Sequence, residues 1–165
     1  MDIKNILVPI DFSSSSHRIF ELGHCLAEHV SASIHLLHVI ESCCSNEPKS
    51  LISDAKFIHK LRIKNAKEEL IKFKFEVPHS DIEIIVHLAE GTAHKEILLY
   101  ATRNNIDMII IASHGWTNHP NMIMGKVADK IMRQANIPVI CIKSNLPVIK
   151  NRVEKLKRIG ENLLS

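Results

Sequence analysis

Two glycines and a lysine stand where the chain could hold a phosphate group. The segment Ala112-Ser-His-Gly115 follows an apolar run, and Gly125-Lys126 begins ten residues after Gly115. Because it has no Cβ, Gly115 allows the backbone to approach an anion closely. Gly125 precedes an expected helix, whose first N–H groups and dipole attract negative charge. Lys126 is unfavourable beside that dipole unless an anion binds there. The competing interpretation is a surface lysine that extends into water.

A second group of candidate residues follows the first apolar run of the chain, Asn5–Ile10. Asp11 comes directly after this run and precedes the four serines at 13–16. Its carboxylate could bind polar groups of a ligand, or it could cap the turn before the serines, as Asp often does. His114 could donate an imidazole N–H to an anion, although a single histidine in a loop is more often polar surface.

The cysteines and histidines do not predict a metal site. The four cysteines are Cys25, Cys43, Cys44 and Cys141, and they form no C-x-x-C pair. The eleven histidines include no H-x-x-x-H pair, the spacing that places two ligands on one helix face. We therefore expect free thiols and no bound metal.

Composition indicates one ordinary globular domain. The chain has 165 residues and 18.7 kDa, with 45% apolar and 24% charged residues, a balance typical of folded proteins. Its longest apolar runs, Met108–Ala112 and Ile137–Ile142, are far shorter than the roughly 18 residues of a membrane span. The start of the chain does not resemble a secretory signal, so we expect a cytoplasmic protein that does not bind membranes.

The charge distribution argues against a nucleic-acid-binding domain. There are 21 basic and 18 acidic residues, a net charge of +3, and residues 145–165 alone contribute five basic and two acidic side chains. Residues 1–144 are therefore formally neutral, without the clustered cations on which nucleic-acid affinity depends. Aromatic residues make up only 4% of the chain, too few for a base-stacking platform.

Hydrophobic patterning predicts strands and helices in strict alternation. The expected strands are Asn5–Ile10, Ser33–Val39, Ile82–Leu88, Ile106–Ala112 and Val139–Ile142. The expected helices begin after the serines at 13–16, near Ser53, at Gly91-Thr92 and near Gly125. The first helix should bury a stripe of Ile19, Leu22, Leu26 and Val30. Short connections in such a pattern give an α/β fold, an open parallel sheet with helices on both faces. Ligands bind such sheets at the carboxyl ends of the strands.

Four segments of the chain resemble, in order and spacing, the universal stress protein family. They are Ile6-Leu-Val-Pro-Ile-Asp-Phe-Ser13, Leu36-Leu-His-Val39, Ala112-Ser-His-Gly115 with Gly125 ten residues on, and Ile137-Pro-Val139. The resemblance covers residues 3–143. It implies an adenine nucleotide alpha hydrolase-like fold, with a five-stranded parallel sheet in the order 3-2-1-4-5.

The resemblance also implies a nucleotide site. One branch of the family binds ATP through G-x-x-G-x9-G-[ST], with magnesium as a candidate accompanying ion, and the other branch lacks this loop. In this chain Ala112 replaces the first glycine and Lys126 the terminal Ser or Thr. Alanine is tolerable if its φ is negative, and the lysine supplies a cation in place of a hydroxyl. The implied role of Asp11 is to hold the adenosine, and that of Val39 is to offer its backbone to the adenine edge. The implied site comprises Pro9, Ile10, Asp11, Val39, Ala112, His114, Gly115, Gly125, Lys126 and Val127.

Three functions remain open on the sequence alone. The first is a stress or signalling protein that binds an adenine nucleotide without an efficient catalytic cycle, at most a slow ATPase. The second, favoured by the departures at Ala112 and Lys126, is a dimeric interaction protein of the same family that binds no nucleotide. The third is a flavodoxin-like electron carrier. This function needs aromatic side chains on both sides of the flavin ring, and the candidates for that role, Tyr100 and Trp116, are few.

Two expectations concern assembly. The strand Val139–Ile142 should form an edge of the sheet, and the resemblance implies a homodimer in which two such edges pair. The chain divides into a domain over residues 1–144 and an extension over 145–165. In the extension, Ile149, Val153, Leu156 and Leu163 lie at the spacing of an amphipathic helix, which we expect to pack on the body or on the sister subunit.

Overall fold

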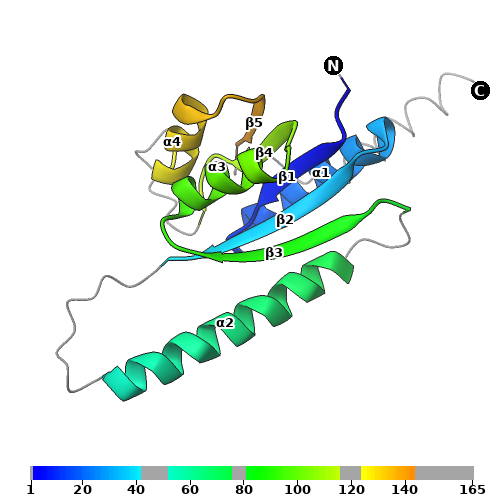
Figure 1. Cartoon of the computed structure of the whole chain (residues 1–165). Helices are drawn as coiled ribbons and strands as arrows, with labels where there is room; N and C mark the ends of the chain where they lie inside the picture. Colours follow the sequence, from blue (N-terminus) through cyan, green and yellow to red (C-terminus); the bar gives the residue numbers. More distant parts are fainter. Residues whose placement is uncertain (1, 42–51, 76–80, 116–123, 144–165) are drawn as a thin grey trace, which may run out of the picture.

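The computed structural model describes residues 2–41, 52–75, 81–115 and 124–143. The C-terminal extension and Trp116 lie outside these ranges. Strands and helices alternate along the chain (Figure 1), in the order β1 (Asn5–Pro9), α1 (Ser14–Val30), β2 (Ser33–Ile40), α2 (Ile52–Phe75), β3 (Ile84–Glu90), α3 (Ala93–Arg103), β4 (Met108–Ala112), α4 (Lys126–Gln134) and β5 (Val139–Ile142).

The five strands form one sheet in the order β3-β2-β1-β4-β5, and every neighbouring pair is parallel. Both the α/β class and the predicted strand order are confirmed. β1 is the central strand, and its Leu7 and Val8 are completely buried. Since β1 and β4 are neighbours whose connections leave on opposite faces, the loops after them meet at the carboxyl edge of the sheet, as the topology of such sheets requires.

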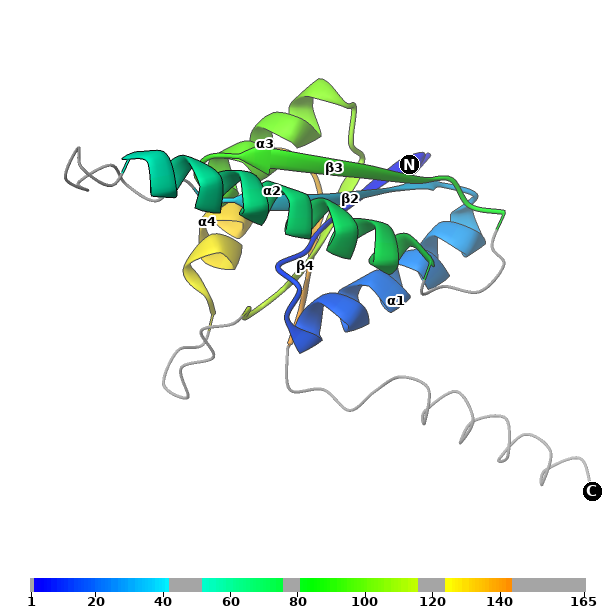
Figure 2. The ribbon, with the colours of Figure 1, turned by 90° about the horizontal axis from the view of Figure 1, so that it is seen from below.

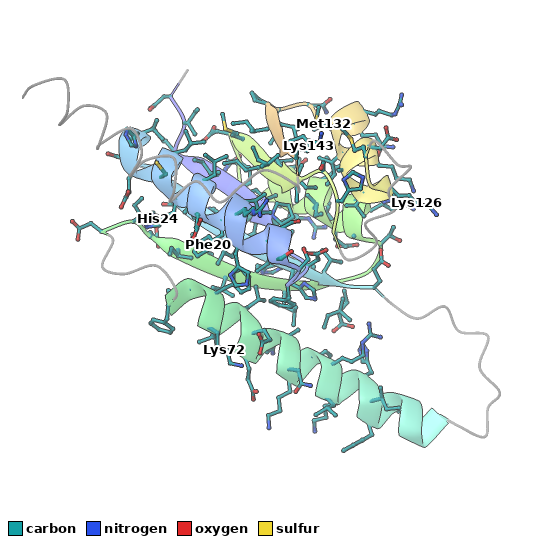
Figure 3. The ribbon with its side chains drawn as sticks, turned by 180° about the vertical axis from the view of Figure 1, so that it is seen from behind. Phe20, His24, Lys72, Lys126, Met132 and Lys143 are labelled. Carbon is teal, nitrogen blue, oxygen red and sulfur yellow. The ribbon has the colours of Figure 1, made fainter. Side chains whose placement is uncertain are left out.

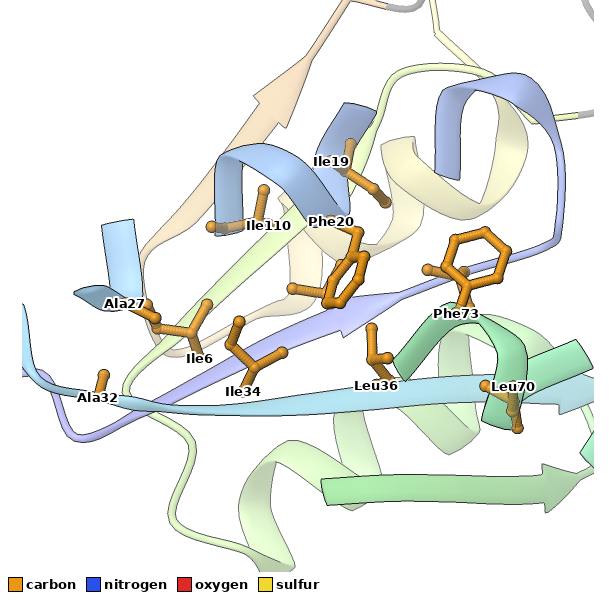
Figure 4. Packing of buried hydrophobic residues seen from close by; sticks show 12 residues of the cluster. Ile6, Ile19, Phe20, Ala27, Ala32, Ile34, Leu36, Leu70, Phe73 and Ile110 are labelled. Carbon is orange, nitrogen blue, oxygen red and sulfur yellow. The ribbon is translucent and has the colours of Figure 1, made fainter. Parts of the chain in front are cut away.

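Each face of the sheet carries its own hydrophobic core. Alternate side chains point to opposite faces of a strand, so Ile6 and Val8 pack with α1 and α2, while Leu7 packs with α3 and α4. Figure 4 shows the first of these clusters, with Phe20 of α1 and Phe73 of α2 lying over β1 and β2. The two cores fix the helices on both sides of the sheet.

The buried stripe of α1 differs from the predicted one. Among the predicted residues Ile19 is buried, Leu22 and Leu26 are only half-buried, and Val30 is 43% exposed. The buried residues of α1 are Ser15, Ser16, Ile19, Phe20, Gly23, His24 and Ala27, and Leu22 and Leu26 pack against the same core while partly exposed. Small residues at Gly23 and Ala27 let the helix lie close to the sheet. A Cβ on Gly23 would stand 2.9 Å from Val8 Cγ2, so the larger leucines lie at the flanks of the contact.

Helix α2 lies along β3 and extends past the end of that strand (Figures 1 and 2). It is held by the buried Ala66, Leu70 and Phe73 and by a polar contact of 3.0 Å between His59 Nε2 and Glu90 Oε2. No helix in the described ranges combines the length and the apolar character needed to cross a membrane.

A buried polar pair links the sheet to α3. His35 of β2 is 6% exposed, and its Nδ1 lies 2.9 Å from the hydroxyl of Tyr100. Its Nε2 faces the side-chain oxygen of Asn5 at 3.4 Å, so a neutral ring donates to Asn5 and accepts from Tyr100. Burial lowers the pKa of His35, and nearby Glu83 opposes this only partly. Burial also lowers the pKa of His38.

These histidines should make the protein less stable in mild acid. Below pH 6.5, their ordinary pKa, the unfolded chain binds protons that the folded chain excludes, so the free energy of unfolding falls as pH falls. The slope is at most about 1.4 kcal/mol per pH unit for each group. Replacing His35 by Gln keeps a polar partner without titrating and should flatten the slope between pH 6.5 and 5 in urea unfolding. An unchanged slope would contradict this assignment.

Candidate functional site

The candidate site lies at the carboxyl ends of β1 and β4 and begins with an Asp-centred turn. Oδ1 of Asp11 accepts hydrogen bonds from the backbone N–H of Ser13 at 3.0 Å and from the hydroxyl of Ser16 at 2.8 Å. The hydroxyl of Ser16 in turn accepts from the Asp11 N–H at 3.0 Å. The turn predicted as one interpretation of Asp11 is therefore present. It uses one carboxylate oxygen and fixes the start of α1.

The second carboxylate oxygen brings the two loops together. Oδ2 of Asp11 lies so close to the Cα of Gly115 that a Cβ built on Gly115 would overlap it. A side chain at 115 would therefore force the carboxylate of Asp11 to shift. The sequence suggested that this glycine admits a ligand, whereas the structure shows that it admits the carboxylate of Asp11. The two predicted site residues are direct neighbours although 104 positions separate them.

The turn also contains a residue that the sequence gave no reason to select. Phe12 has a φ of +62°, a left-handed conformation that is rare and costly for a bulky residue. The centroid of its ring lies 4.3 Å from that of the His38 ring and 5.8 Å from that of the Phe73 ring. His38 itself donates from Nδ1 to the carbonyl of Ile10 at 2.8 Å. These contacts hold the strained backbone in place.

Val39 presents its backbone toward this turn. The carbonyl of Leu37 accepts a hydrogen bond from Ile10 N–H at 2.8 Å, the last such bond between β1 and β2. The N–H and C=O groups of residues two apart in a strand face the same side. Those of Val39, two residues after Leu37, therefore also face the β1 side, at a level that lies past the end of β1. The structure therefore places the Val39 backbone beside the loop that carries Asp11.

The loop after β4 is closed at its base. The N–H of Gly125 donates to the carbonyl of Ser113 at 2.7 Å, so the chain returns to the end of β4 where α4 begins. Gly125 is the N-cap of α4 and makes no side-chain cap. Lys126, labelled in Figure 3, is the first residue of the helix and is exposed. A helix start, two glycines and a cation are thereby gathered at the carboxyl end of β4.

Other predicted residues have simpler roles. Ala112 ends β4 in regular pairing with Ile142 and is absent from the residues of positive φ, so alanine is accommodated there. Pro9 is buried at the end of β1. The side chain of Ile10 belongs to the core under α1, and that of Val127 packs against the core under α3 and α4. These two can contribute backbone to a site, but their side chains serve the core.

His114 is 8% exposed, so it is a buried ring rather than polar surface. Its Nδ1 lies 3.0 Å from the hydroxyl of Ser113. Within the described ranges, no group of three His, Cys, Asp or Glu side chains is arranged to hold a metal ion. The candidate chemistry is therefore that of an anion and hydrogen-bond site, built from backbone, Asp11 and Lys126.

The contact between Asp11 and Gly115 gives a testable coupling. Replacing Gly115 by Ala should lower the free energy of unfolding by about 1–3 kcal/mol, because the new methyl group overlaps Oδ2 of Asp11. In an Asp11→Ala background the same replacement should cost much less, since the overlapping oxygen is gone. Urea unfolding of the four proteins measures this cycle. Equal costs in both backgrounds would show that the two residues do not meet.

Known proteins share both the sequence and the fold. The model of the Universal stress protein family matches residues 2–143. A universal stress protein of Methanocaldococcus jannaschii is 27% identical over 153 residues, which cover 85% of this chain and 94% of the relative. A universal stress protein structure from Lactobacillus plantarum has a TM-score of 0.77 at 21% identity, covering 86% of this chain and 99% of that one.

A second similar structure contains a nucleotide. The universal stress protein of Archaeoglobus fulgidus, solved in complex with dAMP, has a TM-score of 0.57 at 20% identity and covers 87% of this chain and 100% of that one. The matched family model spans all five strands of the sheet and both loops of the candidate site. The chain belongs to the universal stress protein family.

Proposed function

We propose that this protein binds an adenine nucleotide, with ATP as the preferred ligand, at the carboxyl ends of β1 and β4. The observation that carries the proposal is the meeting of Asp11, Gly115 and the start of α4 at one edge of the sheet. Two solved members of the family contain adenine nucleotides, dAMP in one and cAMP in another. Family membership does not support the flavodoxin-like alternative.

The adenosine half would lie against the turn after β1. The backbone of Val39 faces that turn and offers a donor and an acceptor in a fixed geometry, which suits the polar edge of adenine. Asp11 would hold the ribose, since carboxylates accept hydrogen bonds from hydroxyl groups. Because the Asp11 turn and the ring contacts of Phe12 already fix this region, little ordering would be needed on binding.

The phosphates would lie at the loop after β4. The first N–H groups of α4 and the helix dipole favour an anion, and Lys126 adds a full positive charge. The lysine replaces a hydroxyl of the family pattern, so this chain would rely more on charge and less on a directed hydrogen bond. Magnesium would be bound through the phosphates. The proposal includes at most a slow turnover of the bound nucleotide.

Removing the cation should weaken ATP binding selectively. Lys126→Ala should reduce ATP affinity about tenfold or more by calorimetric titration, because a charged contact to phosphate is lost, while adenosine binding should be unchanged. Lys130→Ala is the matched control. Lys130 is also exposed on α4 but one turn further along, so it should have little effect. Equal effects of the two replacements would contradict the assignment of Lys126.

Closing the base of the loop should abolish phosphate binding. A Cβ at Gly125 would stand 3.1 Å from the carbonyl oxygen of Ser113, and the larger side chain of valine would also crowd the start of α4. Gly125→Val should therefore lose ATP binding. A thermal melt of this variant should show that it still folds. If the wild-type protein itself binds neither ATP, ADP nor AMP, the family's other branch, an interaction protein without nucleotide, is the better description.

We further propose that the protein forms a homodimer through β5. This strand lies at the edge of the sheet, and its four residues are half-buried. The carbonyls of Pro138 and Ile142 bond to β4, so the backbone groups of Val139 and Cys141 face outward, where a second copy could pair with them. The extension at 145–165, which lies beyond the family match, would pack on the body or the sister subunit.

Pairing through β5 predicts the mass of a dimer and a single substitution that should dissociate it. Sedimentation at micromolar concentration should give twice 18.7 kDa. Cys141→Pro should reduce this to a monomer, because proline removes an outward N–H without breaking a bond to β4. Cys141→Ser is the control and should stay dimeric. A monomeric wild-type protein would refute the pairing, as would a proline variant that folds and remains a dimer.

A further inference from the structure

The outer face of α2 is apolar although nothing in the described structure covers it. Phe57 is 69% exposed and Phe75 is 75% exposed. Between them, Leu61 and Ile71 are 46% and 51% exposed. At 100° per residue, these four side chains lie on one stripe, opposite the buried Ala66, Leu70 and Phe73. Figure 3 shows side chains of α2 projecting away from the sheet.

The stripe has the spacing of a helix-pairing seam. Its successive positions are Phe57, Leu61, Lys64, Glu68, Ile71 and Phe75, which are separated alternately by four and three residues. This alternation keeps one line of side chains facing a second helix. The two ends of the seam are apolar, and the two central positions carry opposite charges. In the single chain, Lys64 Nζ already lies 3.9 Å from Glu68 Oε1.

The seam is also symmetric about its own centre. Phe57 and Phe75 lie nine residues on either side of Ala66, Leu61 and Ile71 lie five, and Lys64 and Glu68 lie two. Two antiparallel copies related by a two-fold axis at the level of Ala66 would therefore place Phe57 against Phe75, Leu61 against Ile71 and Lys64 against Glu68. Every position would meet a partner of matching chemistry, as a two-fold interface requires.

We propose that a second copy of this chain docks on α2, in an antiparallel helix pair along this seam. Eight apolar side chains, four from each copy, leave water over a length of about 27 Å. At the centre the two Lys64–Glu68 pairs combine, so that each charge gains a second opposite neighbour. The proposal does not depend on nucleotide binding or on pairing through β5. Together with the β5 contact, it would join dimers into closed tetramers or longer chains.

The charges on α2 match a second copy better than other occupants, but repulsion between lysines makes the contact weak. Helix α2 has seven basic and three acidic residues, and the extension at 145–165 is also basic, so that segment offers no complementary charge. An anionic surface would attract the lysines but would repel Glu68 in the middle of the stripe. Between two copies, however, Lys60, Lys67 and Lys74 lie along one flank and repel one another. The pairing is therefore expected only at tens to hundreds of micromolar protein.

Charge reversal at the centre of the seam tests both the occupant and the register. Lys64→Glu places like charges opposite each other twice in the pair, as does Glu68→Lys. Each single variant should weaken the association at least about tenfold in sedimentation equilibrium at ionic strength near 0.15 M. The double variant Lys64→Glu/Glu68→Lys restores opposite charges and should recover association. Mixing the two single variants should also recover it, because each then complements the other.

Lys56→Glu is the matched control. Lys56 is exposed on the same helix but lies off the seam, one turn before Lys60 on the lysine flank, so reversing its charge should not weaken the association. Circular dichroism should show an unchanged fold for every variant, since both central side chains are exposed. The proposal is overturned if wild type shows no association that responds to positions 64 and 68, or if the double variant and the mixture fail to recover it.

Two further measurements show whether the extension at 145–165 or an anionic lipid surface, rather than a second copy, covers the seam. Deleting residues 145–165 should leave the association that depends on positions 64 and 68 unchanged. If this association appears only after deletion, or is lost by it, the extension and not a second α2 covers the seam. Vesicles of phosphatidylcholine and phosphatidylglycerol should not compete with the pairing. Binding to them that weakens in Lys64→Glu and strengthens in Glu68→Lys, without self-association, would assign the stripe to an anionic lipid surface instead.

Discussion

The carboxylate of Asp11 connects the two halves of the candidate site. One oxygen fixes the turn that starts α1, and the other lies against Gly115 at the end of β4. A single carboxylate therefore lies in contact with both loops, the one after β1 and the one after β4. The fold thus provides a prearranged edge between the two loops. A ligand binding there would lose less free energy to ordering than one that had to assemble the site.

The fold was predictable because its signals are local and agree with one another. Short apolar runs indicated the strands, amphipathic segments indicated most of the helices, and the alternation of the two restricts the topology to a parallel sheet. The strand order came from the resemblance in four segments and is confirmed. The predicted stripe of α1 was right at Ile19, partly right at Leu22 and Leu26, and wrong at Val30, because spacing alone favours the largest apolar residues. In the structure, close packing on Val8 instead selects Gly23 and the small Ala27.

The sequence predicted where the candidate residues lie in the fold, but not the contacts they make; their part in a site stays a prediction. Asp11, Gly115 and Gly125 are all at the carboxyl edge, as the order of the elements required. That Gly115 makes room for Asp11, rather than only for a ligand, depends on a contact across 104 positions, which no local pattern encodes. The left-handed backbone of Phe12 is likewise invisible in the sequence, since a bulky residue gives no signal for it. It follows from the turn and from the rings of His38 and Phe73 around it.

Helix α2 shows why periodicity fails when a helix has two apolar faces. Its inner residues Leu70 and Phe73 and its outer residues Ile71 and Phe75 alternate so closely that they show little amphipathic contrast. Only packing against β2 and β3 reveals which set belongs to the core. Once the inner set is fixed, contacts within the described part of the chain do not account for the outer set, whose phenylalanines are exposed there. Lys64 and Glu68 lie symmetrically between the two apolar ends of the outer face. An incidental apolar patch would not be expected to have this arrangement. The arrangement therefore favours recognition of another molecule over a role in folding.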